Sequence, residues 1–132
     1  VLPFDVSCCI YEFVRNHTNQ RQIGKGMMLT NFDRTLAPNR ALIRRIKDTA
    51  NTLHKPLQLD MFNGGGTDGG EAHKSRDGKP TAVSCLPVRY GHCAYSIAHL
   101  QDIADAIDIF TELIVNFDEA AYRASINFLK GV

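Results

Sequence analysis

The sequence predicts an α/β domain, in which short strands alternate with helices along the chain. Four runs rich in apolar and β-branched residues have the length of strands, at 1–10, 27–32, 57–62 and 81–87. Other segments carry apolar residues at helical spacing. The 132 residues suffice for one domain with its own core. Together these observations favour a layered architecture of sheet and helices.

Three helices are predicted. Asn39 is a candidate N-cap for the first, which Pro56 closes because proline cannot continue a helix. A long amphipathic helix begins at Leu100, and a further helical stretch covers 118–129. The apolar positions that indicate the first two helices are Leu42, Ile43, Ile46, Ala50 and Leu53, and then Leu100, Ile103, Ala104, Ile107, Phe110, Leu113 and Phe117.

A glycine-rich loop covers 63–70, with five glycines in eight positions. Glycine permits positive φ angles and close approach of the backbone to a ligand. The loop could bind phosphate, line a substrate cleft or simply form a turn. No Gly-Lys-Ser/Thr follows it, as a Walker A loop would require, and it lacks the dinucleotide-binding fingerprint.

Composition restricts the classes of partner. Lys plus Arg total 15 and Asp plus Glu total 14, so no basic field favours nucleic acid. No apolar run approaches the length of a membrane span. The four cysteines are scattered, without a CxxC pair, which favours a reducing, cytoplasmic location. The sequence starts with Val1 rather than methionine, and its first residues have the composition of the middle of a strand. We therefore expect the chain to belong to a longer polypeptide.

Asp5 and His92 are the candidate metal ligands. Asp5 lies inside an apolar strand, where a carboxylate needs a hydrogen-bonding partner or a metal ion. His92 follows the fourth predicted strand, and neutral imidazole is a common metal ligand. Asp5 could instead be an acid at a strand end whose hydrogen bonds are made within the protein, and His73 could be the ligating histidine in place of His92. Cys93 could be a thiolate ligand or simply a small buried residue.

Both candidates could converge at the carboxyl edge of one sheet, where α/β proteins place their sites. A catalytic zinc usually takes three protein ligands. The sequence offers no obvious third, so we expect residues absent from this chain to complete the site.

Several motifs occur together in one order. They are Gly24-Lys25-Gly26, Pro38-Asn39, the run from Gly64 to Asp68 with Gly70 and His73, Pro80-Thr81-Ala82-Val83, and Pro87-x-Arg89-Tyr90-x-His92. In this respect the whole chain resembles the carboxyl-terminal part of the M42 family of metallo-aminopeptidases. The resemblance implies a three-layer, phosphorylase/hydrolase-like α/β sandwich with a mixed sheet. Residues 1–132 would then form the carboxyl-terminal part of a single catalytic domain.

The resemblance also implies removal of amino-terminal residues from peptides at a site with two divalent metal ions, zinc or cobalt. Asp5 matches one ligating aspartate of the family and His92 its final histidine, each on a different metal ion. The other three ligands, and the glutamate that acts as general base, would lie upstream of Val1. The isolated chain is therefore expected to be inactive.

Further roles follow from the same resemblance. Gly65, Gly66 and Thr67 would present backbone groups to the peptide substrate, and Asp68 would support the loop through hydrogen bonds. The full-length protein would form a homo-oligomer. The rival interpretation is a non-catalytic half-domain that associates with itself through its uncovered sheet.

The sequence departs from the family pattern at two places. Cys93-Ala94 and Ser96 stand where the family often has Ser-Pro and a glutamate, which puts the support of His92 in question. The segment 11–13 replaces a more polar, glycine-bearing loop, which points to altered specificity.

Overall fold

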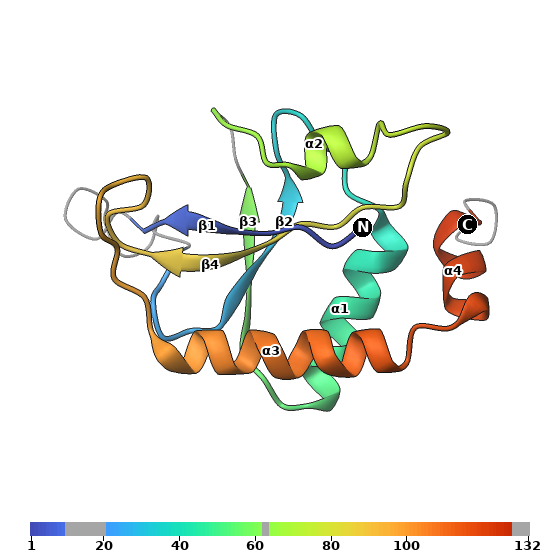
Figure 1. The fold of residues 1–132 in the computed structure, drawn as a ribbon. Coiled ribbons are helices and arrows are strands. Elements are labelled where there is room, and N and C mark those ends of the chain that lie inside the picture. Colours follow the sequence, from blue (N-terminus) through green and yellow to red (C-terminus); the bar gives the residue numbers. More distant parts are fainter. Residues whose placement is uncertain (10–20, 62–63, 128–132) are drawn as a thin grey trace.

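The computed structural model describes residues 1–9, 21–61 and 64–127 (Figure 1). Four strands and four helices lie in these ranges, in the order β1 (Phe4–Cys8), β2 (Met27–Phe32), α1 (Arg40–Thr52), β3 (Leu57–Met61), α2 (Gly69–Ala72), β4 (Ser84–Val88), α3 (Leu100–Val115) and α4 (Glu119–Ile126). The alternation confirms the predicted α/β class.

The four strands form one mixed sheet in the order β1-β4-β2-β3. β1 runs parallel to β4, and β2 runs parallel to β3. The two pairs are joined by a short antiparallel contact, in which Met28 pairs with Cys85 and Leu29 with Ser84. Figure 1 shows the pairs crossing steeply, with both arrowheads of β1 and β4 at the same end.

The larger core lies on one face of the sheet. Met27 and Leu29 of β2 are fully buried there. The rest of this cluster comes mainly from α1 and α3: Leu42, Ile43, Ile46, Ala50, Ala82, Ala106, Ile109 and Leu113. Met28 points to the opposite face, as strand alternation requires, and joins Leu36, Val83 and Cys85 in a smaller cluster. The long helices α1 and α3 therefore share one face.

The first predicted helix is confirmed at its amino end. The Asn39 side chain accepts the Leu42 amide at 3.0 Å, and its own amide group donates to the Ser125 carbonyl at 2.7 Å. One residue therefore caps α1 and attaches it to α4. The helix ends at Thr52, ahead of Pro56 as expected.

Several boundaries differ from the sequence prediction. The first strand covers only Phe4–Cys8 of the predicted 1–10. The fourth strand begins at Ser84 rather than at residue 81, because the Thr81 carbonyl accepts the Asn39 amide instead of joining the sheet. The predicted glycine-rich loop ends in the short helix α2, which its two glycines disfavour by propensity. Residue 10, residues 62–63 and the predicted end of the last helix at 128–129 lie outside the described residues, as does the segment 11–13.

Within the described ranges, no helix has both the length and the apolar character that crossing a membrane requires.

Candidate functional site

Asp5 lies on the face of the sheet that α1 and α3 leave uncovered. Phe4, its neighbour in β1, points the other way, and its ring packs edge-on against Phe110 of α3 at 5.6 Å. Side chains alternate along a strand, so Asp5 and Ser7 share the opposite face. Asp5 is half-buried and pairs in register with Cys85.

The Asp5 carboxylate covers part of the sheet edge. Its Oδ1 atom accepts the backbone N–H of Val6 at 2.7 Å. The Pro3 carbonyl and the Cys9 amide pair with β4, so the even-numbered residues of β1 direct their backbone groups to the free edge. No other hydrogen bond reaches this carboxylate within the described part of the chain, which leaves Oδ2 available for a ligand.

His92 is exposed on the loop that follows β4. The backbones of Arg89 and Ile97 pair in both directions, at 2.9 and 3.0 Å, and so close this loop. Because Cys8 pairs with Val88 at the carboxyl ends of the parallel strands, the loop begins beside the end of β1. Figure 1 shows it extending past both arrowheads.

The structure thus brings the loop of His92 and the strand of Asp5 to one end of the sheet. Asp5 itself pairs with Cys85, inside the sheet rather than at its carboxyl edge. The described residues contain no group of three or more His, Cys, Asp or Glu side chains that could hold a metal ion. Both ligand assignments therefore stay predictions.

The two alternative ligands lie elsewhere or lack support. The Nδ1 atom of His73 lies 3.1 Å from the Gly69 carbonyl at the end of α2. Cys93 is exposed and not the small buried residue considered as one alternative. All four cysteines are free thiols. Burial raises the pKa of Cys9 to about 11 and that of Cys85 to about 12, so both remain protonated near neutral pH.

Asp33 anchors the glycine-rich loop. Its carboxylate accepts the Thr35 backbone amide at 2.6 Å and the hydroxyls of Thr35 and Thr67, each at 2.8 Å. Burial by itself would raise the pKa of Asp33, but the hydrogen bonds from Thr35 and Thr67 outweigh it and lower that pKa. The Arg34 amide also donates to the Gly65 carbonyl at 3.1 Å. The loop is thus held by a buried charge.

The glycines of this loop fall into two groups. A Cβ atom at Gly66 or Gly70 would lie 2.6 or 2.1 Å from the Thr35 side chain, and one at Gly69 would lie 2.4 Å from Val83. Gly64 and Gly65 face open space. None of these five has a positive φ angle. Close packing against Thr35 and Val83 therefore explains glycine at three of these positions, and a positive φ angle explains none of them. The approach of the loop to a ligand stays a prediction.

Asp68 contributes its backbone to the loop. Its carbonyl accepts the amides of Glu71 and Ala72, whereas its exposed side chain makes no capping hydrogen bond. Asp33 and Thr67 support the loop through their side chains. The role expected for the Asp68 side chain stays a prediction.

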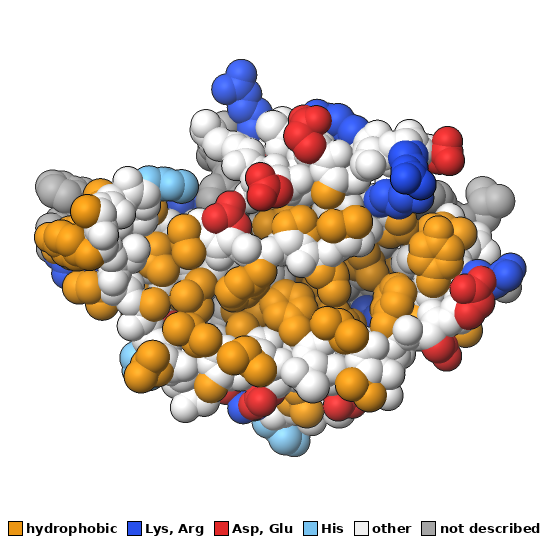
Figure 2. Space-filling model, viewed as in Figure 1, with side chains coloured by type: hydrophobic (Ala, Val, Ile, Leu, Met, Phe, Trp, Pro, Cys, Tyr) orange, Lys and Arg blue, Asp and Glu red, His pale blue; other side chains and the backbone are white. Residues whose placement is uncertain are grey.

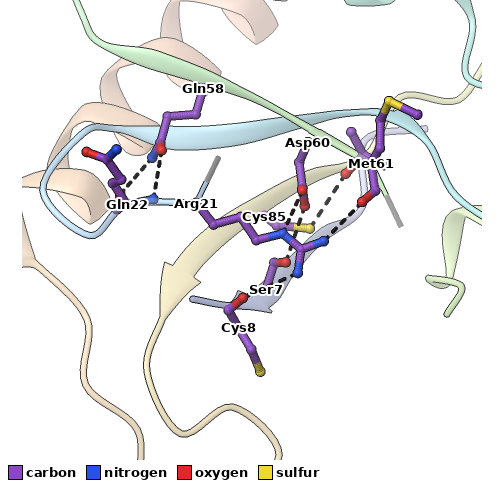
Figure 3. Close-up of polar contacts among 9 residues, drawn as sticks. Ser7, Cys8, Arg21, Gln22, Gln58, Asp60, Met61 and Cys85 are labelled. Atoms are coloured by element: carbon purple, nitrogen blue, oxygen red, sulfur yellow. Dashed lines mark hydrogen bonds and ion pairs between the residues drawn. The ribbon is translucent and has the colours of Figure 1, made fainter. Parts of the chain in front are cut away.

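A polar cluster behind β1 was missed by the sequence reasoning (Figure 3). The Arg21 guanidinium donates to the Asp60 carboxylate at 2.7 Å, to the Met61 carbonyl at 3.0 Å and to the Cys8 carbonyl at 3.3 Å. The Ser7 hydroxyl donates to the second Asp60 oxygen at 3.2 Å. This cluster joins β1 to β3, the two edge strands. In the sequence, the one feature that could have indicated this cluster was Asp60, an aspartate inside the third predicted strand.

The Gly24-Lys25-Gly26 motif also has a structural role. The amides of Gly24 and Gly26 donate to the buried Asp102 carboxylate at 2.7 and 2.8 Å. Both glycines have positive φ angles, and a Cβ atom at Gly26 would lie 2.0 Å from the Pro56 carbonyl oxygen. The motif therefore holds the first turn of α3 and does not contribute to the candidate site.

Known proteins of similar sequence are aminopeptidases by name. The sequence profile of the M42 glutamyl aminopeptidase family matches residues 1–109. An Acetivibrio thermocellus protein named "Putative aminopeptidase" is 27% identical over 99 residues, covering 75% of this chain and 30% of that protein. "Putative aminopeptidase FrvX" of Escherichia coli K12 is 37% identical over 71 residues, covering 54% of this chain and 20% of the relative.

Solved structures agree with the sequence match. The TET aminopeptidase of a marine Thaumarchaeota archaeon superposes with a TM-score of 0.88 at 31% identity, covering 94% of this chain and 35% of that chain. An aminopeptidase of Desulfurococcus kamchatkensis has the same fold, with a TM-score of 0.82 at 21% identity over 99% of this chain and 37% of its own. This chain spans about a third of the length of these structures. It belongs to the M42 glutamyl aminopeptidase family.

Proposed function

We propose that the chain forms part of the catalytic domain of a metal-dependent aminopeptidase, which removes amino-terminal residues from peptides. Asp5 and His92 would each bind one of two divalent metal ions, zinc or cobalt. The observation that carries this proposal is the parallel pairing of β1 with β4, which brings the strand of Asp5 and the loop of His92 to one end of the sheet of an M42 family member.

The donor atoms suit these metals. Zinc accepts carboxylate oxygen and imidazole nitrogen, and a bound ion supplies Lewis-acid polarisation of the peptide carbonyl and of water. The Asp5 carboxylate accepts only the Val6 amide within the described residues, so it can turn to a metal ion at the cost of one hydrogen bond. The remaining ligands and the general-base glutamate would come from outside this chain, which is why we expect the isolated chain to be inactive.

The glycine-rich loop supports peptide binding on the same face of the sheet. Thr67 is fixed through Asp33, and Gly65 is open to solvent, so the loop can present backbone groups to a peptide without large rearrangement. We propose that Gly65, Gly66 and Thr67 contact the substrate in this way. The free cysteines are consistent with a reducing, cytoplasmic compartment.

Assembly of the complete protein is a further part of the proposal. The TET1 peptidase of Pyrococcus horikoshii, which has the same fold at 21% identity and a TM-score of 0.66, can assemble into a tetrahedron or a large octahedral shell. We propose a homo-oligomer for the complete protein that contains this chain as well.

A titration with paramagnetic Co²⁺ tests the ligand assignment. In the ¹⁵N-labelled chain, we expect Co²⁺ to broaden the amide signals around Asp5 and around His92, even where binding is weak. Asp5→Asn should abolish the first effect and His92→Ala the second. His73→Ala is the matched control and should change neither. Broadening that persists in both ligand variants, or that disappears in the control, would refute the assignment.

A second candidate function is that of a self-associating half-domain without catalytic activity. The observation that favours it is the apolar groove between the β1 edge and α3, which Leu2, Phe4, Ile107 and Ile114 help to line. Figure 2 shows hydrophobic side chains gathered over this region. Sedimentation velocity distinguishes the two candidates, because self-association makes the sedimentation coefficient rise with concentration and a monomer shows no such rise.

A further inference from the structure

We propose that Cys8 positions His92, because the Cys8 sulfur is the surface on which the backbone of the His92 loop rests. This inference deepens the proposed function and rests on it, since it concerns the placement of a predicted metal ligand. Cys8 itself would be a positioning residue without direct contact to metal or substrate.

The contact is made through Gly91, the residue that precedes His92. A Cβ atom at Gly91 would lie 2.4 Å from the Cys8 Sγ atom and 3.3 Å from a methyl carbon of Val88. The first distance is well below van der Waals contact, so a side chain at this position would require the Cys8 sulfur or the loop to move. Cys8 and Val88 are paired at the ends of β1 and β4, and together they form a floor under Gly91.

The backbone of the turn explains why this contact matters. Tyr90 and His92 both have left-handed φ angles, 60° and 61°, which are costly for residues with side chains. Gly91 between them has no positive φ angle. The φ angle at this position would therefore allow alanine. Glycine is favoured there because the Cys8 sulfur is so close.

Other contacts also hold the turn. The Tyr90 ring packs against Tyr95 at 5.8 Å, and the Arg89 guanidinium lies over the Tyr90 ring at 5.0 Å. The backbone pairing of Arg89 with Ile97 closes the loop. With these groups fixed, the distance between the Gly91 backbone and the Cys8 sulfur determines where the His92 imidazole lies. Loss of such support for a ligand typically reduces metal affinity by about 10–100-fold.

A double-mutant cycle tests the inference. Gly91→Ala adds a methyl group against the Cys8 sulfur, and Cys8→Ala removes that sulfur. We expect Gly91→Ala to shift the amide signals of residues 89–97 and to weaken Co²⁺ broadening at His92 about tenfold, while the broadening at Asp5 is unchanged. Adding Cys8→Ala to Gly91→Ala should restore both readouts. Gly64→Ala is the matched control, because its methyl group would meet open space.

The outcomes separate this inference from the proposed function. If wild-type chain shows no Co²⁺ effect at His92, the ligand assignment fails, whereas the metal-free amide shifts still report whether Cys8 sets the loop. If Gly91→Ala changes the loop no more than Gly64→Ala does, or if Cys8→Ala fails to restore it, the positioning role is overturned. If Cys8→Ala restores the shifts but His92 binds Co²⁺ equally in all variants, Cys8 shapes the loop without positioning the ligand, and the inference is likewise overturned.

Discussion

The buried polar contacts that hold loops and helix ends, called the closed region below, differ in construction from the apolar groove between the β1 edge and α3, called the open region. In the closed region, three buried polar side chains each have several partners: Asp102 accepts two glycine amides, Asp33 binds two threonines, and Asn39 joins two helices. Around β1, Phe4 and Val6 are substantially exposed, and α3 presents Ile107 and Ile114 to the same groove.

This difference separates the residues that maintain the fold from a surface that is open to contact with further polypeptide. The closed region contains two of the motifs that carry the family resemblance, and they maintain the fold. The open region contains the β1 edge and apolar side chains of α3, and it lies on the face of the sheet opposite Asp5. A protein that uses one region for stability and the other for contact with further polypeptide should respond differently to substitutions in the two, and the following predictions test that expectation.

The largest effect is expected in the closed region, at Gly26. Gly26→Ala would place a methyl group 2.0 Å from the Pro56 carbonyl oxygen at a φ angle of +85°. We expect a loss of about 4 kcal/mol or more in the free energy of unfolding, or failure to fold. Denaturant titration followed by circular dichroism measures it.

Gly78→Ala is the control for that substitution. Gly78 has almost the same φ angle, +84°, but the added methyl group would meet only the His73 carbonyl, at 3.7 Å. The left-handed conformation alone should cost about 1 kcal/mol. Equal losses at the two positions would show that backbone conformation, and not the contact with Pro56, explains the requirement for glycine.

A smaller effect, dependent on pH, is expected at Asp33. Its pKa is lowered in the folded chain, so its stabilisation is present above the unfolded pKa of about 4 and is lost as the pH falls through the folded pKa. Asp33→Asn should cost about 2–3 kcal/mol at pH 7 and should flatten the loss of stability below pH 4. Asp77→Asn, which removes an exposed carboxylate, is the control. An unchanged acid slope in Asp33→Asn would contradict the anchor.

The smallest effect on stability is expected in the open region. Ile107→Lys and Ile114→Lys replace side chains that are 59% and 63% exposed. The free energy of unfolding should change by no more than about 0.5 kcal/mol. Any concentration-dependent association should weaken instead, as measured by sedimentation velocity. A large loss of stability in these monomeric variants would mean that the groove belongs to the core.

Local patterns in the sequence were enough to predict much of the fold. The helical spacing from Leu42 to Ala50, the Asn39 cap and Pro56 fixed α1, since caps and periodicity act over a few residues. The strand order, with β4 between β1 and β2, was not predictable, because it depends on contacts between distant segments. The glycine motifs were recognised, but their partners Asp102, Asp33 and Thr35 could not be identified from spacing alone.

The candidate site was predictable only in part, for the same reason. The family pattern predicted Asp5 and His92 as ligands, which stays a prediction; the strand of Asp5 and the strand before the His92 loop are neighbours in the sheet. The Arg21–Asp60 pair and the contact between Cys8 and Gly91 join segments that no local pattern connects. The first depends on the approach of β1 to β3, and the second on the parallel pairing of β1 with β4.

The central claim is that this chain is part of a working metallo-aminopeptidase. The most direct test is to isolate, from the source cell, every polypeptide that contains this sequence, using an antibody against the chain, and to assay release of amino-terminal residues with and without a chelator. Given that the chain covers 35% of the TET aminopeptidase, we predict a product about three times its mass, or a complex containing the missing part. Its activity should disappear with the chelator and return with Zn²⁺ or Co²⁺. A product of 14.7 kDa without hydrolysis before or after metal addition would contradict the claim.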